Sequence, residues 1–143
     1  MKDITDLKEL LNSQKLAVLA TQSDDGPHES LVAFSCSDDA RRLFLMTHRQ
    51  TRKYRDIIGN PRIAMLIDNR SNRDSDFEQA TAITAKGVAK ELNGDARDKW
   101  LATYLKKHPQ LTDFARLPEV ALIKIEVTDY QIAGFDTTHH IKP

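Results

Sequence analysis

The chain has 143 residues, 40% of them hydrophobic, and its 21 basic and 21 acidic side chains give a net charge of zero. We expect one globular domain over residues 1–143, because a chain of this size can bury a core of its own. A balanced charge argues against general nucleic-acid binding. The N-terminus lacks an apolar signal region, and no apolar run approaches the roughly 20 residues that cross a bilayer. We therefore expect no membrane partner and a cytoplasmic location.

The first third of the chain predicts a helix and three strands. Apolar residues recur at helical spacing over residues 4–12, and buried-type strands are expected over 16–21, 28–34 and 43–46. The Ser-Asp-Asp-Gly-Pro sequence at residues 23–27 favours a tight turn between the first two strands. Three strands joined by short turns indicate an antiparallel meander.

A basic segment follows, in which residues 41–62 carry seven Lys or Arg and one acid, so the rest of the chain is net negative. Thr51 is a suitable N-cap for a helix over 51–58, which Gly59-Asn60-Pro61 would end. The cations near the start of this helix are Arg49, Arg52, Lys53 and Arg55. Each is unfavourable there by roughly 0.3 to 1 kcal/mol unless an anion such as phosphate is bound. The alternative is a solvated basic surface, and the charge pattern alone does not decide between the two.

The remaining elements complete a mainly β chain with flanking helices. Strands are expected over 63–67, 81–92 and 120–132, a mobile loop over 68–75 and a helix over 96–107. Gly87 indicates a bulge or a close backbone approach. Trp100 and Tyr104 suit either a core or a dimer interface, and their helical spacing favours the core. Six strands with few helices predict an antiparallel β-barrel with helices packed outside it.

Chemistry by side chains alone is not indicated. The single cysteine, Cys36, excludes an internal disulfide and a cysteine-based metal cluster, and we interpret it as an ordinary free thiol. No Ser/His/Asp or His/carboxylate arrangement has recognisable spacing, so we assign no catalytic residue and no metal ligand. Any chemistry should come from a cofactor.

Four motifs follow one another along the chain: the Gly-Pro-His-Glu-Ser-Leu-Val sequence at 26–32, Thr47 followed by Thr51-Arg52-Lys53, Asn60-Pro61-Arg62, and Gly87-Val88-Ala89. In this order they resemble the FMN-binding split-barrel proteins of the pyridoxamine 5'-phosphate oxidase-like superfamily. The resemblance covers nearly the whole chain. Their order and spacing are more specific than any one of them.

The resemblance implies a six-stranded antiparallel split β-barrel with an FMN site. In the family an Arg-Lys pair at a helix start holds the flavin phosphate, which matches Arg52 and Lys53. A strand matching Glu29 to Val32 runs along the isoalloxazine. The cofactor-binding residues that the resemblance implies are Glu29, Ser30, Leu31, Val32, Thr47, Gln50, Thr51, Arg52 and Lys53. The family forms its flavin sites between two subunits, which implies a homodimer.

The C-terminal half is most similar to the haem-utilisation branch of the superfamily, through residues 104–110 and Ala133-Gly134-Phe135. In that branch a C-terminal histidine can ligate haem, and His139 or His140 matches it by position only. Residues 139–143 read as the start of a disordered tail.

The implied function is flavin-dependent redox chemistry on an unidentified small molecule, with the protein placing the substrate against the flavin ring. Vitamin B6 oxidation is not expected, because Ser30 and Ser35 stand where those oxidases carry basic residues. Their C-terminal Arg and His segment is also missing. Two alternatives remain open: a haem-binding or haem-degrading protein, and a non-catalytic flavin-binding protein.

Overall fold

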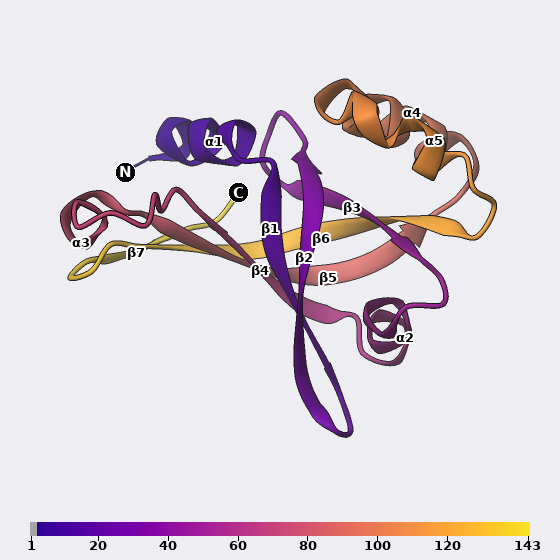
Figure 1. Cartoon of the computed structure of the whole chain (residues 1–143), viewed down its shortest axis with the longest axis horizontal. Helices are drawn as coiled ribbons and strands as arrows, with labels where there is room; N and C mark the ends of the chain where they lie inside the picture. The colour runs from indigo at the N-terminus through magenta and orange to yellow at the C-terminus, as the bar shows by residue number, and fades with distance from the viewer. Residues whose placement is uncertain (1–2) are drawn as a thin grey trace.

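The computed structural model describes residues 3–143 and contains one antiparallel sheet with helices around it (Figure 1). The strands are β1 (Leu16–Ser23), β2 (Gly26–Cys36), β3 (Arg42–His48), β4 (Arg62–Asp68), β5 (Ala82–Leu92), β6 (Val120–Ala133) and β7 (Thr138–Ile141). The helices are α1 (Ile4–Ser13), α2 (Arg52–Gly59), α3 (Asp76–Gln79), α4 (Gly94–Lys107), the 3-10 helix η1 (Pro109–Leu111) and α5 (Thr112–Ala115).

The sheet closes into a barrel because β6 pairs with two strands of the ring. The strand order is β3-β2-β1-β4-β5-β6-β7, and an additional pairing joins β3 to β6. Six strands therefore form a closed antiparallel ring, and β7 lies outside it, paired with residues 130–133 of β6. This confirms the predicted six-stranded split barrel with flanking helices.

Local sequence explains the tight connections of the barrel. Ser23 pairs with Gly26, so Asp24 and Asp25 form the two-residue tip of the β1–β2 hairpin. Gly26 has a φ of 110°, which residues with a Cβ rarely adopt. In Figure 1 this hairpin projects beyond the rest of the sheet.

Gly87 allows β5 and β6 to approach closely, as its place in the sequence predicted. The register between the two strands shifts between Lys86 and Gly87. A Cβ at Gly87 would lie 2.4 Å from the carbonyl oxygen of Glu126 and 2.7 Å from Cγ2 of Ile125. A side chain here would push apart the strands that close the ring.

Helices cover the barrel and form two apolar cores. Leu7, Leu10 and Leu11 of α1 join the barrel interior. A second cluster lies under α4, where Tyr104 is buried and Trp100 stacks on Phe44 with ring centroids 4.6 Å apart. Trp100 and Tyr104 thus pack in a core, as the helical spacing favoured.

One expectation about the C-terminus is wrong. Residues 138–141 form β7 instead of a disordered tail, because the long β6 offers a free edge after its pairing with β3 ends at Glu126.

Within residues 3–143, no helix is both long and apolar enough to cross a bilayer.

Candidate functional site

The candidate site is built around the first turn of α2, which Thr51 caps as predicted. The Thr51 hydroxyl accepts a hydrogen bond from the Tyr54 N–H (3.3 Å) and donates to the His48 carbonyl (2.8 Å). Its oxygen also lies 2.8 Å from the hydroxyl of Thr47, whose side chain is buried. These bonds fix the turn between β3 and α2, so the backbone N–H groups at the helix start face outward in one arrangement.

Two of the four cations around this turn, Arg49 and Arg52, have carboxylate partners, which corrects the expectation that all four lack compensation. Arg49 pairs with Glu91 at 2.7 Å, and Arg55 donates to the Gln50 carbonyl at 3.0 Å. Arg52 contacts two carboxylates, which are described below. Arg42 lies at the other end of β3, where it pairs with Glu126 at 3.4 Å. Three of the seven Lys and Arg residues of the segment 41–62, Arg42, Arg49 and Arg52, therefore have carboxylate partners in the fold.

Lys53 differs from Arg49, Arg52 and Arg55, whose side chains all have partners within residues 3–143. Its ammonium group makes no hydrogen bond or ion pair with any other residue of 3–143. It stands beside Arg52 in the first turn of α2, next to the N–H groups that a helix leaves unpaired. Lys53 is thus the cation in the first turn of α2 whose charged group is free to bind an anion from outside the chain.

Glu91 ties the start of α2 to β5. It accepts hydrogen bonds from Arg49 (2.7 Å) and from the Tyr54 hydroxyl (2.6 Å), while Arg49 also donates to the Pro118 carbonyl (2.8 Å). The hydrogen bond from Arg49 lowers the pKa of Glu91, and the bond to Glu91 raises the pKa of Tyr54. These contacts occupy the Arg49 guanidinium within the chain.

The predicted contact strand, Glu29 to Val32, lies where the barrel splits. Residues 26–33 of β2 pair with β1, whereas pairing of β2 with β3 is limited to residues 34–36. Continuing that register would set Val32 opposite Thr47, but the two strands separate before that point. In the described chain, the edge of β2 at residues 29–32 therefore keeps backbone groups without a strand partner.

Ser30 has a polar group in this region that no described residue satisfies. Its Oγ is buried and has no hydrogen-bond partner among residues 3–143. A buried hydroxyl without a partner is costly, and a bound group or water usually satisfies it. Ser35 has a similar unpaired hydroxyl, but Phe44 lies opposite it in the sheet, in the core under α4.

The predicted residues thus gather on two segments. Glu29, Ser30, Leu31 and Val32 follow the open edge of β2, and Thr47, Gln50, Thr51, Arg52 and Lys53 surround the start of α2. Leu31 is exposed, whereas Val32 and Thr47 are buried. Val32 and Thr47 could therefore contact a ligand through their backbone groups, or through their side chains after a movement of the chain. Their roles as cofactor contacts stay predictions.

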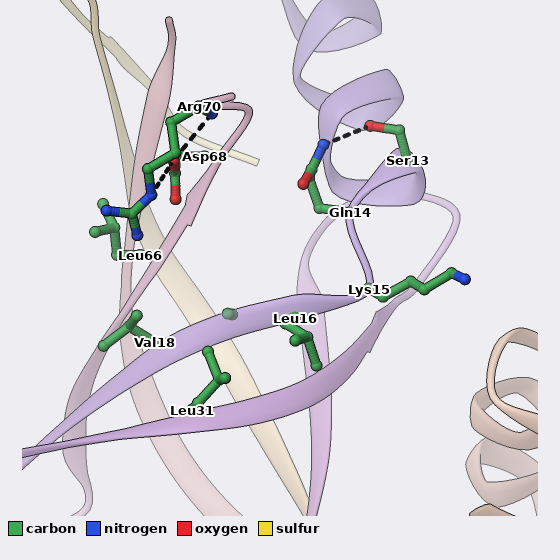
Figure 2. A pocket seen from close by; sticks show the side chains of 10 residues that line it. Ser13, Gln14, Lys15, Leu16, Val18, Leu31, Leu66, Asp68 and Arg70 are labelled. Carbon is green, nitrogen blue, oxygen red and sulfur yellow. Dashed lines mark hydrogen bonds and ion pairs between the residues drawn. The ribbon is translucent and has the colours of Figure 1, made fainter. Parts of the chain in front are cut away.

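The outer face of the barrel carries apolar residues that no helix covers. We call the outer apolar face the set of Leu16, Val18, Ala20, Leu31, Ala64, Leu66 and Val88. Figure 2 shows part of it, a hollow of about 410 Å³ with Leu16, Val18, Leu31 and Leu66 between α1 and β4. Arg70 lies at its rim, paired with Asp68 at 2.9 Å. A second hollow of about 580 Å³ adjoins Ala20, Ala64 and Val88.

The two C-terminal histidines lie elsewhere. His139 and His140 are exposed on β7, and Nδ1 of His140 lies 3.5 Å from a carboxylate oxygen of Asp129. Within residues 3–143, no group of three or more His, Cys, Asp or Glu side chains could hold a metal ion.

Sequence reasoning missed the acidic partners of the basic turn. Asp25 lies 27 positions from Arg52, and Glu91 lies 42 positions from Arg49. No local spacing signals such pairs. Asp56 was visible as an acid four residues after Arg52, the spacing of neighbours on one helix face.

Comparison with known proteins gives a family match over most of the chain. Residues 5–133 match the pyridoxamine 5'-phosphate oxidase family. A pyridoxamine 5'-phosphate oxidase homolog of Schizosaccharomyces pombe is 29% identical over 123 residues, which cover 77% of this chain and 65% of that protein. The chain therefore spans slightly less than two thirds of the length of this relative.

Solved structures agree on the fold. A heme binding protein from Mycobacterium smegmatis superimposes with a TM-score of 0.82 at 18% identity, covering 93% of this chain and 55% of that chain. An FAD-binding protein from Mesorhizobium loti gives 0.75 at 14% identity, covering 98% of this chain and 95% of that chain. At such identities the likeness concerns the fold alone.

Proposed function

The chain belongs to the pyridoxamine 5'-phosphate oxidase family, and on this premise we propose that it binds FMN and serves as a flavin-dependent oxidoreductase for a small molecule. The observation that carries the proposal is Lys53, a cation without a partner among residues 3–143, beside Arg52 at the start of α2. A phosphate at this point would accept charge-assisted hydrogen bonds from both side chains and from free helix N–H groups. The FMN phosphate is the anion that the family match suggests.

The residues present fit the rest of such a cofactor. The open edge of β2 at residues 29–32 offers backbone donors and acceptors to the pyrimidine edge of a flavin ring. The Ser30 hydroxyl, buried and without a partner in the described chain, adds one polar group that a ligand would satisfy. Bound FMN would supply the redox chemistry, while Arg52, Lys53 and the β2 edge would hold and orient it.

We further propose that the protein is a homodimer that pairs through the outer apolar face. Leu16 and Leu31 on this face are 51% and 67% exposed, which is unusual for adjacent large apolar side chains. In a twofold dimer the same patch covers itself, so both copies lose this exposure together. A partner seated there would also lie close to Leu31, beside the predicted flavin contacts.

The visible absorption spectrum of the purified protein tests the cofactor. A flavin spectrum, with FMN released on denaturation, is the expected result. A haem spectrum without flavin would contradict the proposal and favour the haem alternative, which His139 and His140 support by position only. If the protein binds FMN but turns over no reductant or oxidant, the alternative of a non-catalytic flavin-binding protein is favoured.

Sedimentation of a Leu16→Asp variant tests the dimer. A carboxylate in the outer apolar face should separate the subunits and remove FMN binding, because burying an unpaired charge is costly. The matched control is Leu117→Asp, which alters another exposed leucine (42%) outside that face. A monomer that still binds FMN at low micromolar concentration would rule out a site shared between subunits.

A further inference from the structure

Arg52 is held by two carboxylates that come from different parts of the chain. Its Nε lies 3.5 Å from Oδ2 of Asp56, one turn later in α2. One of its Nη atoms lies 3.3 Å from Oδ1 of Asp25, at the tip of the β1–β2 hairpin. The hairpin tip is therefore joined to the start of α2 through the guanidinium that we assign to the phosphate.

The two carboxylates differ in how firmly they are placed. The Asp56 side chain is 6% exposed and accepts a hydrogen bond from the Thr21 hydroxyl at 2.9 Å. Separating it from Arg52 would leave a buried carboxylate without its cation, which is costly. The Asp25 side chain is 76% exposed, and its other contact is the neighbouring Ser23 hydroxyl. Asp25 can turn into solvent at little cost, because water would replace the lost contact.

We propose that Asp25 is an internal competitor for the anion site, and that a phosphate-bearing ligand displaces it from Arg52. This inference rests on the proposed function. Asp56 acts as the fixed positioning residue, since it orients the guanidinium from the buried side. With Asp25 in place, Arg52 contacts two carboxylates, so the two cations Arg52 and Lys53 are balanced by two acids and the site has little net charge. When Asp25 leaves, the site gains one net positive charge that complements a phosphate.

The competition also links binding to the hairpin. Asp25 lies on the hairpin tip, and β2 of that hairpin carries the open edge of residues 29–32. A ligand that takes Arg52 from Asp25 frees the tip of the hairpin whose second strand carries the predicted flavin contacts at residues 29–32. Asp25 therefore lowers the affinity for phosphate ligands by occupying part of the Arg52 guanidinium when no ligand is bound.

The test compares Asp25→Asn with Asp24→Asn, which removes the same charge from the same tip. Asp24 makes no ion pair within residues 3–143. We expect Asp25→Asn to bind FMN about two- to fivefold more tightly than the wild type, the range for losing one exposed ion pair. Asp24→Asn should change FMN affinity less, and riboflavin affinity should stay the same in both variants. Equal gains in the two variants, or weaker binding by Asp25→Asn, would overturn the inference.

A second readout separates this inference from the proposed function. Inorganic phosphate is titrated into the full chain while the Nε–H signal of Arg52 is followed by NMR. Phosphate should shift this signal at lower concentration in Asp25→Asn than in the wild type. If the wild type binds no FMN yet this difference appears, the proposed function fails and the competition stands. If the phosphate titrations are identical, the competition fails whatever the flavin result.

Discussion

At the start of α2, Arg52 pairs with side-chain carboxylates and Lys53 has no partner in residues 3–143, whereas at the end of α4 the polar groups bond to the backbone. There, Lys107 donates to the Leu11 carbonyl at 3.1 Å and lies 4.0 Å from the centre of the Phe34 ring. The buried His108 forms a 2.7 Å hydrogen bond with the Phe34 carbonyl. A ligand can displace the exposed Asp25 carboxylate from Arg52. The Leu11 and Phe34 carbonyls belong to the backbone of α1 and β2, so a ligand cannot displace them without moving these elements.

This comparison separates two uses of polar side chains in one small barrel. At the α4 end, Lys107 and His108 link α4 to α1 and β2, so removing either side chain should lower the free energy of unfolding. At the α2 end, Lys53 has no partner in residues 3–143 and Arg52 has one exposed partner, so removing either cation should lower the affinity for an anion. Variants at either end test this difference between the two regions.

The largest expected effect comes from His108→Ala. The substitution removes a buried ring and leaves the Phe34 carbonyl without its donor, which should lower the free energy of unfolding by about 2 to 4 kcal/mol. FMN affinity of the folded variant should be unchanged. Urea unfolding measures the first quantity and FMN titration the second. His139→Ala is the matched control, since His139 is exposed and should cost little. Unchanged stability in His108→Ala would contradict the structural role of this end.

A smaller effect concerns pH. Burial lowers the pKa of Lys107 to about 8, from an ordinary value of 10.5. Between pH 8 and 9 the folded chain therefore releases a proton that the unfolded chain keeps, so stability should rise with pH. The rise should be less than about 1.4 kcal/mol, the limit for one proton over one pH unit, since Lys107 is partly exposed and screened by solvent.

The pH window matters because burial also raises the pKa of Cys36 to about 12, from 9.0. From about pH 8 upward the unfolded chain begins to lose the thiol proton that the folded chain keeps, and this lowers stability and offsets part of the rise from Lys107. Urea unfolding at pH 8 and 9 should thus show the rise in the wild type and none in Lys107→Met. The same rise in both proteins would assign it to another group.

The sequence predicts those features of the fold that depend on local chemistry. Thr51 caps α2 and Gly87 marks the shift between β5 and β6, because capping and steric fit are properties of single positions. Strand β7 was missed, since Thr-His-His-Ile lacks apolar alternation and pairs only because β6 extends beyond the ring.

The candidate site was predicted less completely. The basic residues were visible, but the distant acidic partners of Arg49 and Arg52 were not, because Glu91 and Asp25 reach them only through the barrel and the hairpin. The fold therefore narrows the anion-binding hypothesis from a cluster of cations to Lys53 with Arg52. Ser30 was named by resemblance, and its unpaired hydroxyl could be recognised only in the structure.

The central claim, that Lys53 and Arg52 hold the FMN phosphate, is tested most directly by titrating FMN and riboflavin into the wild type and Lys53→Ala. Charge-assisted bonds to phosphate are worth about 1.5 to 3 kcal/mol each, so FMN affinity should fall roughly ten- to a hundredfold. Riboflavin, which lacks the phosphate, should bind equally to both proteins. Lys106→Ala, which removes an exposed lysine from α4, controls for net charge. Equal losses for the two ligands, or no loss for FMN, would mean that the start of α2 is only a solvated basic surface.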